Sequence, residues 1–126
     1  MDRKVIKSEK APKALGPYSV AIRAGSFVFA SGQLGLDPQS GNLVAGGIEA
    51  ETRQSLTNIR NVLSDSGSGI ELVVKTTVFL KDMADFPKMN AVYGEFFPEN
   101  PPARSTVQAA LPKGGSVEIE AIALVK

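Results

Sequence analysis

The side chains available for catalysis are few, because none of the 126 residues is a histidine or a cysteine. This excludes thiolate nucleophiles, Ser-His-Asp triads, histidine bases, disulfides and zinc sites built from His or Cys. Proton transfer must use Asp, Glu, Lys or Tyr, and any metal would need oxygen ligands alone. The sequence contains no phosphate-binding loop, acidic calcium loop or dinucleotide fingerprint.

Two glutamates near the end of the sequence are the first candidates for acid-base chemistry. Glu118 and Glu120 stand within residues 117–125, a predicted strand, so both carboxylates lie on one face of it. A solvated pair of this kind is common. On a central strand, however, a carboxylate needs a partner or has a raised pKa, and both situations are frequent at functional sites.

An arginine follows a stiff segment of the chain. Arg104 comes directly after Pro101, Pro102 and Ala103 and opens a predicted strand. Stiffening lowers the entropy cost of presenting the guanidinium group, whose planar fork matches a carboxylate or phosphate with two parallel hydrogen bonds. A salt bridge at the edge of a sheet is the structural alternative.

Three further polar residues stand at places where a ligand could reach them. Tyr18 follows a rigid Gly-Pro pair, Ser31 ends a strand in a Ser-Gly-Gln sequence, and Asn90 borders the apolar side of a predicted helix. Each also has a purely structural interpretation. These are an ordinary strand tyrosine, a strand-end turn and a helix-surface amide, respectively.

Apolar periodicity predicts two helices that would hold these residues in place. The first begins at Ile48 and ends before Gly67, and the second runs from Phe86 to Phe97 with Asp85 as its N-cap. Strands are predicted at residues 3–7, 19–23, 27–31, 73–80, 104–109 and 117–125. The order of elements indicates an α+β domain with a mixed sheet, spanning residues 1–126.

The last predicted strand indicates that both faces of the sheet are covered. Its second half is apolar on both faces, which favours a central position in a sheet that is covered on both sides. Two crossover helices of the same hand tend to lie on one side of the sheet. A neighbouring subunit is therefore expected to cover the other side, making the protein a homo-oligomer.

The composition is typical of a globular protein, with 43% hydrophobic and 21% charged residues and a net charge of +1. This balance disfavours nucleic acid and anionic membranes as partners. The longest apolar run, residues 121–125, is far shorter than the roughly 18 residues of a membrane helix. Without a secretory h-region, a cytoplasmic location is expected, with an organelle left open.

Five segments stand in order along the chain: Gly16-Pro17-Tyr18-Ser19, Ser31-Gly32-Gln33, Val74-Lys75-Thr76-Thr77-Val78, Pro102-Ala103-Arg104-Ser105, and Leu111-Pro112-Lys113 followed by Val117-Glu118-Ile119-Glu120-Ala121-Ile122-Ala123. Together they resemble the RidA/YjgF family of enamine/imine deaminases over nearly the whole chain. The resemblance implies a chorismate-mutase-like fold with two helices on one face of the sheet. It also implies a homotrimer with three clefts between subunits.

The resemblance further implies a set of cleft residues and a reaction. The implied cleft residues are Tyr18, Ser31, Asn90, Arg104 and Glu118. Thr106, where many members carry Cys, would act through its backbone N–H, and Val20 stands where members often carry Gln. The implied activity is hydrolysis of reactive 2-imino acids, the tautomers of 2-aminoacrylate-type enamines, to 2-keto acids and ammonia. Arg104 would hold the carboxylate and Glu118 would activate water, with no metal or cofactor.

Two other functions are compatible with these residues. The cleft could be a sensor that binds 2-keto acids without turnover, and turnover of a freshly generated imine separates this from catalysis. RNA cleavage or translational inhibition is the other alternative. The near-neutral charge and the lack of a basic stretch or aromatic platform argue against it.

Overall fold

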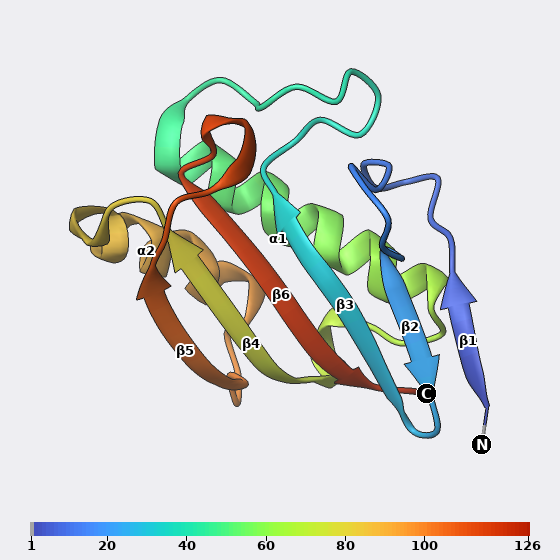
Figure 1. Ribbon diagram of the computed structural model, residues 1–126. Coiled ribbons are helices and arrows are strands. Elements are labelled where there is room, and N and C mark those ends of the chain that lie inside the picture. The colour runs from blue at the N-terminus through green and yellow to red at the C-terminus, as the bar shows by residue number, and fades with distance from the viewer. Residues whose placement is uncertain (1) are drawn as a thin grey trace.

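The computed structural model describes residues 2–126 as an α+β domain with one mixed sheet (Figure 1). The strands are β1 (Arg3–Ile6), β2 (Ala21–Ala24), β3 (Phe27–Leu34), β4 (Val73–Leu80), β5 (Ala103–Gln108) and β6 (Val117–Leu124). The helices are α1 (Gly47–Asp65) and α2 (Phe86–Phe96), with short 3-10 turns η1 (Ile70–Leu72), η2 (Met83–Asp85) and η3 (Pro112–Gly114). The predicted order of elements is confirmed.

The sheet places the last strand in its interior. The strand order is β1-β2-β3-β6-β4-β5, so β6 lies between β3 and β4 as its two apolar faces predict. Only β4 and β5 run parallel within this sheet, and α2 connects them. The remaining neighbours are antiparallel. Strands β1 and β5 form the two edges, and β1 ends one residue before the strand predicted at residues 3–7.

Both helices cover the same face of the sheet, behind the strands in Figure 1. Helix α1 contacts β3, β6 and α2. Its predicted apolar stripe is buried, with Leu56, Ile59 and Leu63 at 0% exposure. Alternate residues of β6, from Val117 to Ala123, point into this core, which leaves Glu118 and Glu120 on the opposite, open face.

The open face of the sheet carries large apolar side chains. Phe27, Phe29, Val107 and Leu124 are all more than one-third exposed. Isolated exposed apolar residues are ordinary, whereas large contiguous apolar patches are common at interaction surfaces. The prediction that helices cover only one face is thus confirmed, and a covering subunit stays a prediction. Within residues 2–126, no helix is long and apolar enough to cross a bilayer.

Some local predictions need correction. Strand β3 extends three residues further than predicted, to Leu34, and contains a register shift against β6 between Ala30 and Gln33. The predicted N-cap of α2, Asp85, makes no side-chain capping bond. Instead, Asp82 accepts a hydrogen bond from the Ala84 N–H one turn earlier, because η2 precedes the helix.

Candidate active site

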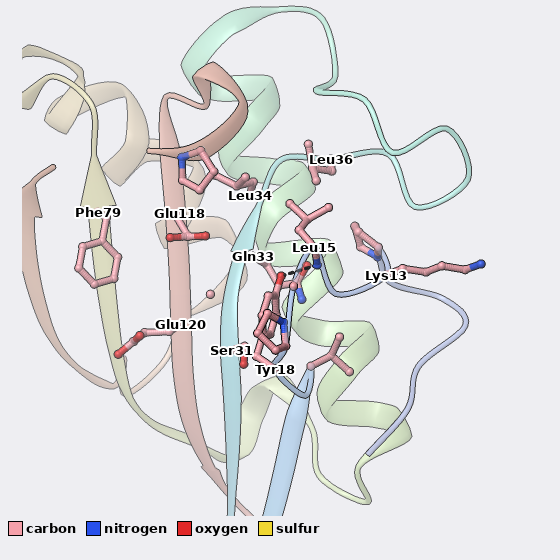
Figure 2. A pocket seen from close by; sticks show the side chains of 16 residues that line it. Lys13, Leu15, Tyr18, Ser31, Gln33, Leu34, Leu36, Phe79, Glu118 and Glu120 are labelled. Atoms are coloured by element: carbon pink, nitrogen blue, oxygen red, sulfur yellow. Dashed lines mark hydrogen bonds between the residues drawn. The ribbon is translucent and has the colours of Figure 1, made fainter. Parts of the chain in front are cut away.

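A cleft of about 580 Å³ opens beside the end of β3 and the open face of β6 (Figure 2). It is bounded by the loop that precedes β2, by the bulged end of β3, by Phe79 of β4 and by Pro112 of η3. Tyr18, Ser31 and Glu118 all line it, together with Glu120. Three of the six predicted site residues therefore lie around one hollow.

Glu118 is the carboxylate best placed for chemistry. It is half-buried, and its pKa is raised by burial and, to a smaller extent, by the nearby charge of Glu120. Its side chain packs against Gly32, where an added Cβ would come within 2.9 Å of both Cγ and Cδ of Glu118. Gly32 lies in the register shift of β3, so the bulge makes room for the carboxyl group. Glu120 is exposed, which separates the two glutamates in character.

The hydroxyl groups of Tyr18 and Ser31 differ in the hydrogen bond that each can still make in the cleft. The Leu15 N–H donates to the Tyr18 hydroxyl at 3.0 Å, drawn as a dashed line in Figure 2, which leaves the phenol proton free to donate. The Ser31 hydroxyl donates to the Ser19 carbonyl at 2.7 Å, which leaves its lone pairs free to accept. The loop around Tyr18 is thus tied to its own backbone, as the rigid Gly-Pro sequence predicts.

Arg104 lies on the other side of the sheet. It pairs in register with Thr76 and points towards the helices, where its guanidinium carbon is 4.7 Å from the centre of the Tyr93 ring and 5.4 Å from that of Phe86. Such cation–π contacts stabilise a guanidinium by about 0.5–2 kcal/mol. The Tyr93 hydroxyl is in turn 2.6 Å from the Thr76 hydroxyl oxygen.

Arg104 makes no ion pair with any carboxylate in the described part of the chain. The alternative of an edge salt bridge is therefore wrong for residues 2–126. Arg104 is half-buried and stacks on aromatic rings, and a guanidinium held in this way can still donate hydrogen bonds in its own plane.

Asn90 and Thr106 lie on the same side of the sheet as Arg104. Asn90 stands on α2 one turn from both Phe86 and Tyr93, and Thr106 follows Arg104 on the same face of β5. The Asn90 Oδ1 and the Thr106 Oγ1 are buried, and neither has a hydrogen-bond partner within residues 2–126. Unpaired buried polar atoms are costly and rare. This contradicts the interpretation of Asn90 as a plain surface amide.

The predicted site residues thus form two groups in one chain. The cleft group is Tyr18, Ser31 and Glu118, and the arginine group is Asn90, Arg104 and Thr106. None of the arginine group lines the 580 Å³ cleft. Val20, predicted to depart from the family pattern, lines that cleft as a buried apolar side chain.

Sequence reasoning named Gln33 only as part of the Ser31-Gly32-Gln33 segment and did not assign it to the site, and it missed a buried polar stripe on α1. Gln33 lines the cleft at 5% exposure. Glu51, Ser55 and Asn58 are buried beside the apolar stripe of α1, and their one-turn spacing was the available signal. Among residues 2–126, no group of three or more carboxylates is arranged to hold a metal ion.

A family model described as Endoribonuclease L-PSP matches residues 8–125. The chain belongs to the RidA/YjgF family. A Bos taurus RidA/YjgF relative named 2-iminobutanoate/2-iminopropanoate deaminase is 52% identical over 123 residues, which are 97% of this chain and 90% of the relative. An Arabidopsis thaliana relative named Reactive Intermediate Deaminase A, chloroplastic, is 50% identical over 96% of this chain and 65% of its own length.

Solved structures of RidA/YjgF proteins share the fold. RidA from an Antarctic Psychrobacter species is 42% identical with a TM-score of 0.93, over 97% of this chain and 99% of that one. TdcF from E. coli, solved with bound serine, is 40% identical with a TM-score of 0.92, over 98% of this chain and 99% of that one.

Proposed function

We propose that this protein hydrolyses reactive 2-imino acids, in equilibrium with their enamine tautomers, to 2-keto acids and ammonia. The observation that carries the proposal is Glu118, a half-buried carboxyl group with a raised pKa in a cleft of a chain without His or Cys. The deaminase names of relatives at about half sequence identity support it.

In the proposed reaction Glu118 acts first as base and then as acid. It takes a proton from a water molecule as the water oxygen bonds to the imine carbon, and it passes this proton to the imine nitrogen, which becomes the amine of the resulting carbinolamine. The carbinolamine then collapses. Glu118 takes the proton of the carbinolamine hydroxyl and gives it to the nitrogen, the C–N bond breaks with its electron pair leaving on ammonia, and the C=O bond of the keto acid forms. The net change is imine plus water to ketone plus ammonia, which requires no redox partner.

Arg104 is proposed to hold the substrate carboxylate, with the backbone N–H of Thr106 as a second donor. Its guanidinium group has no protein carboxylate partner within residues 2–126, which supports this role. Tyr18 would donate a hydrogen bond to the substrate, and Ser31 would accept one. Asn90, which stands one turn from Phe86 and Tyr93 on α2 and has a buried Oδ1, is proposed to belong to the same site.

Because the two groups of site residues lie apart in one chain, we propose that a homotrimer brings the arginine group of one subunit to the Glu118 cleft of the next. The apolar open face supports an interface between subunits. Sedimentation should give about three times 13.3 kDa at micromolar concentration. A monomer of 13.3 kDa under those conditions would remove the shared site. A cytoplasmic location stays a prediction.

The decisive experiment generates the imine in the cuvette. An amino-acid oxidase or a dehydratase releases the imino acid, and its decay is followed with and without the protein, using Glu118→Gln as the matched control. Accelerated decay that depends on Glu118 is expected. If decay is not accelerated but a 2-keto acid binds in calorimetry, the cleft is a sensor. A parallel arm with RNA in a dilute salt series tests the endoribonuclease activity that the family model's description names.

A further inference from the structure

Three polar side chains of α1 are buried against the sheet. Glu51, Ser55 and Asn58 are 6%, 0% and 0% exposed and stand one turn apart, so they form one stripe along the helix. Buried polar groups are costly unless they are hydrogen-bonded. We call these three residues the polar stripe of α1, and its bonds lead to the two strands that carry the cleft.

Three hydrogen bonds from the stripe hold the end of β3 and the residues that follow it. Ser55 Oγ donates to the Gln33 carbonyl at 2.6 Å, and Asn58 Nδ2 donates to the carbonyls of Leu34 and Leu36 at 3.2 and 2.9 Å. The pairing of β2 with β3 ends at Ala30, so no strand on that side serves these carbonyls. The polar side chains of α1 take the place of the missing strand.

The contact between the end of β3 and α1 is also sterically tight. A Cβ added at Gly35 would come within 2.6 Å of the Glu51 carbonyl oxygen. The chain after the bulge therefore lies directly on the helix backbone, and a shift of α1 would move the bulge with it.

The third member of the stripe holds the start of β6. Glu51 Oε1 accepts from the Ser116 N–H at 2.8 Å, and the Ser116 carbonyl accepts from the Lys81 N–H at 3.0 Å. Ser116 directly precedes β6, and Glu118 is the second residue of that strand. Glu51 makes no ion pair within residues 2–126, and its carboxylate instead accepts a hydrogen bond from the backbone.

We infer that the polar stripe of α1 positions the cleft: Ser55 and Asn58 set the β3 wall that contains Gly32, and Glu51 sets the β6 wall that contains Glu118. The packing of the Glu118 carboxyl against Gly32 spans these two walls. One helix thus fixes both sides of the contact that surrounds the proposed base. The three are positioning residues, and the kinetic part of this inference rests on the proposed function.

The test compares two hydroxyl deletions on the same helix. Ser55→Ala removes a buried hydroxyl that donates to β3, whereas Thr52→Val removes a buried hydroxyl that donates at 2.7 Å to the Ile48 carbonyl within α1. Misplacement by about 1 Å costs up to roughly 100-fold in rate. We expect kcat for imine hydrolysis to fall roughly 10- to 100-fold in Ser55→Ala with KM little changed, and Thr52→Val to stay within about twofold of the wild type.

A second readout does not depend on activity. The carboxyl carbon of Glu118 is titrated by NMR in folded wild type and in both variants. Loosened walls admit water, so the pKa of Glu118 should fall towards its ordinary value in Ser55→Ala and stay unchanged in Thr52→Val. Glu51→Gln, which keeps an acceptor oxygen, should resemble the wild type, and Glu51→Leu should resemble Ser55→Ala.

The outcomes separate the two proposals. If the wild-type protein does not accelerate imine decay, the proposed function fails and the Glu118 titration alone decides the role of the stripe. Equal titration of Glu118 in Ser55→Ala, Thr52→Val and the wild type overturns the positioning role. A loss of melting temperature without a change in kcat or in the Glu118 titration means that the stripe only stabilises the fold.

Discussion

Replacing Gly32 by alanine tests whether the position of the Glu118 carboxyl group matters. The new Cβ would lie 2.9 Å from both Cγ and Cδ of Glu118 and 3.2 Å from its Oε2. Carbon atoms in favourable contact lie about 3.5–4.0 Å apart, so the Glu118 side chain must move by roughly 0.6–1.1 Å. Gly32 does not have the positive φ that disfavours other residues, so alanine fits its backbone conformation.

The expected loss follows from that displacement. A 1 Å error in the position of a reacting group costs up to about 100-fold in rate. This factor corresponds to about 2.7 kcal/mol of additional barrier, at about 1.36 kcal/mol for each factor of ten. The fold itself should tolerate the change, because the atoms that must move belong to the end of a half-buried side chain.

The assay is the coupled imine-decay measurement, with thermal unfolding recorded on the same sample. Gly94→Ala is the matched control, because Gly94 lies in α2 and a Cβ there meets no heavy atom within 4 Å. This control should keep its activity and gain about 0.5–1 kcal/mol of stability, since alanine favours a helix. A folded Gly32→Ala protein with wild-type kcat/KM would refute the reasoning.

Three further predictions concern the charged residues of the site. Glu118→Gln should fold normally and lose about 100-fold or more in kcat, the loss typical of a removed general base, whereas Glu120→Gln should be much milder; equal effects contradict the assignment. Because the folded-state pKa of Glu118 is raised, the stability that this group contributes is present at low pH and is lost as pH rises through that pKa. Urea unfolding should therefore show Glu118→Gln gaining stability relative to the wild type with rising pH, and a pH-independent difference counts against a raised pKa. Arg104→Lys keeps the charge but loses the planar fork, so kcat/KM should fall roughly 10- to 150-fold. Calorimetry with a 2-keto acid should show weaker binding by a similar factor, and unchanged affinity means that Arg104 does not bind the carboxylate.

The features that the sequence predicts well are those recorded in local periodicity. The apolar stripe of α1 and the two-faced pattern of residues 117–125 depend on spacing within one segment. The central place of β6 and the helices on one face follow from these patterns and from the handedness of crossovers.

The features that sequence reasoning missed depend on contacts between distant segments. The bulge at Gly32 makes room for Glu118, and the Ser116 N–H bonds to Glu51, but spacing within one segment records neither contact. From the sequence alone, Glu51, Ser55 and Asn58 are indistinguishable from a solvated helix face. Only the packing of β3 against α1 shows that they are buried. Similarly, the sequence shows that Arg104 and Thr106 lie on one face of β5. It does not show how far either residue lies from the cleft.

The interior position of β6 also has a consequence for protein synthesis. Strands β3 and β4 flank it, yet β6 leaves the ribosome after both of them and after β5. Until β6 emerges, the strands already synthesised can pair only as two separate groups, β1-β2-β3 and β4-β5, each with an edge that β6 later covers. Closure of the sheet is then a single late step that joins sequence-distant strands, which is slow for chains dominated by nonlocal contacts. During translation these open edges are where chaperones would bind and where neighbouring nascent chains would aggregate.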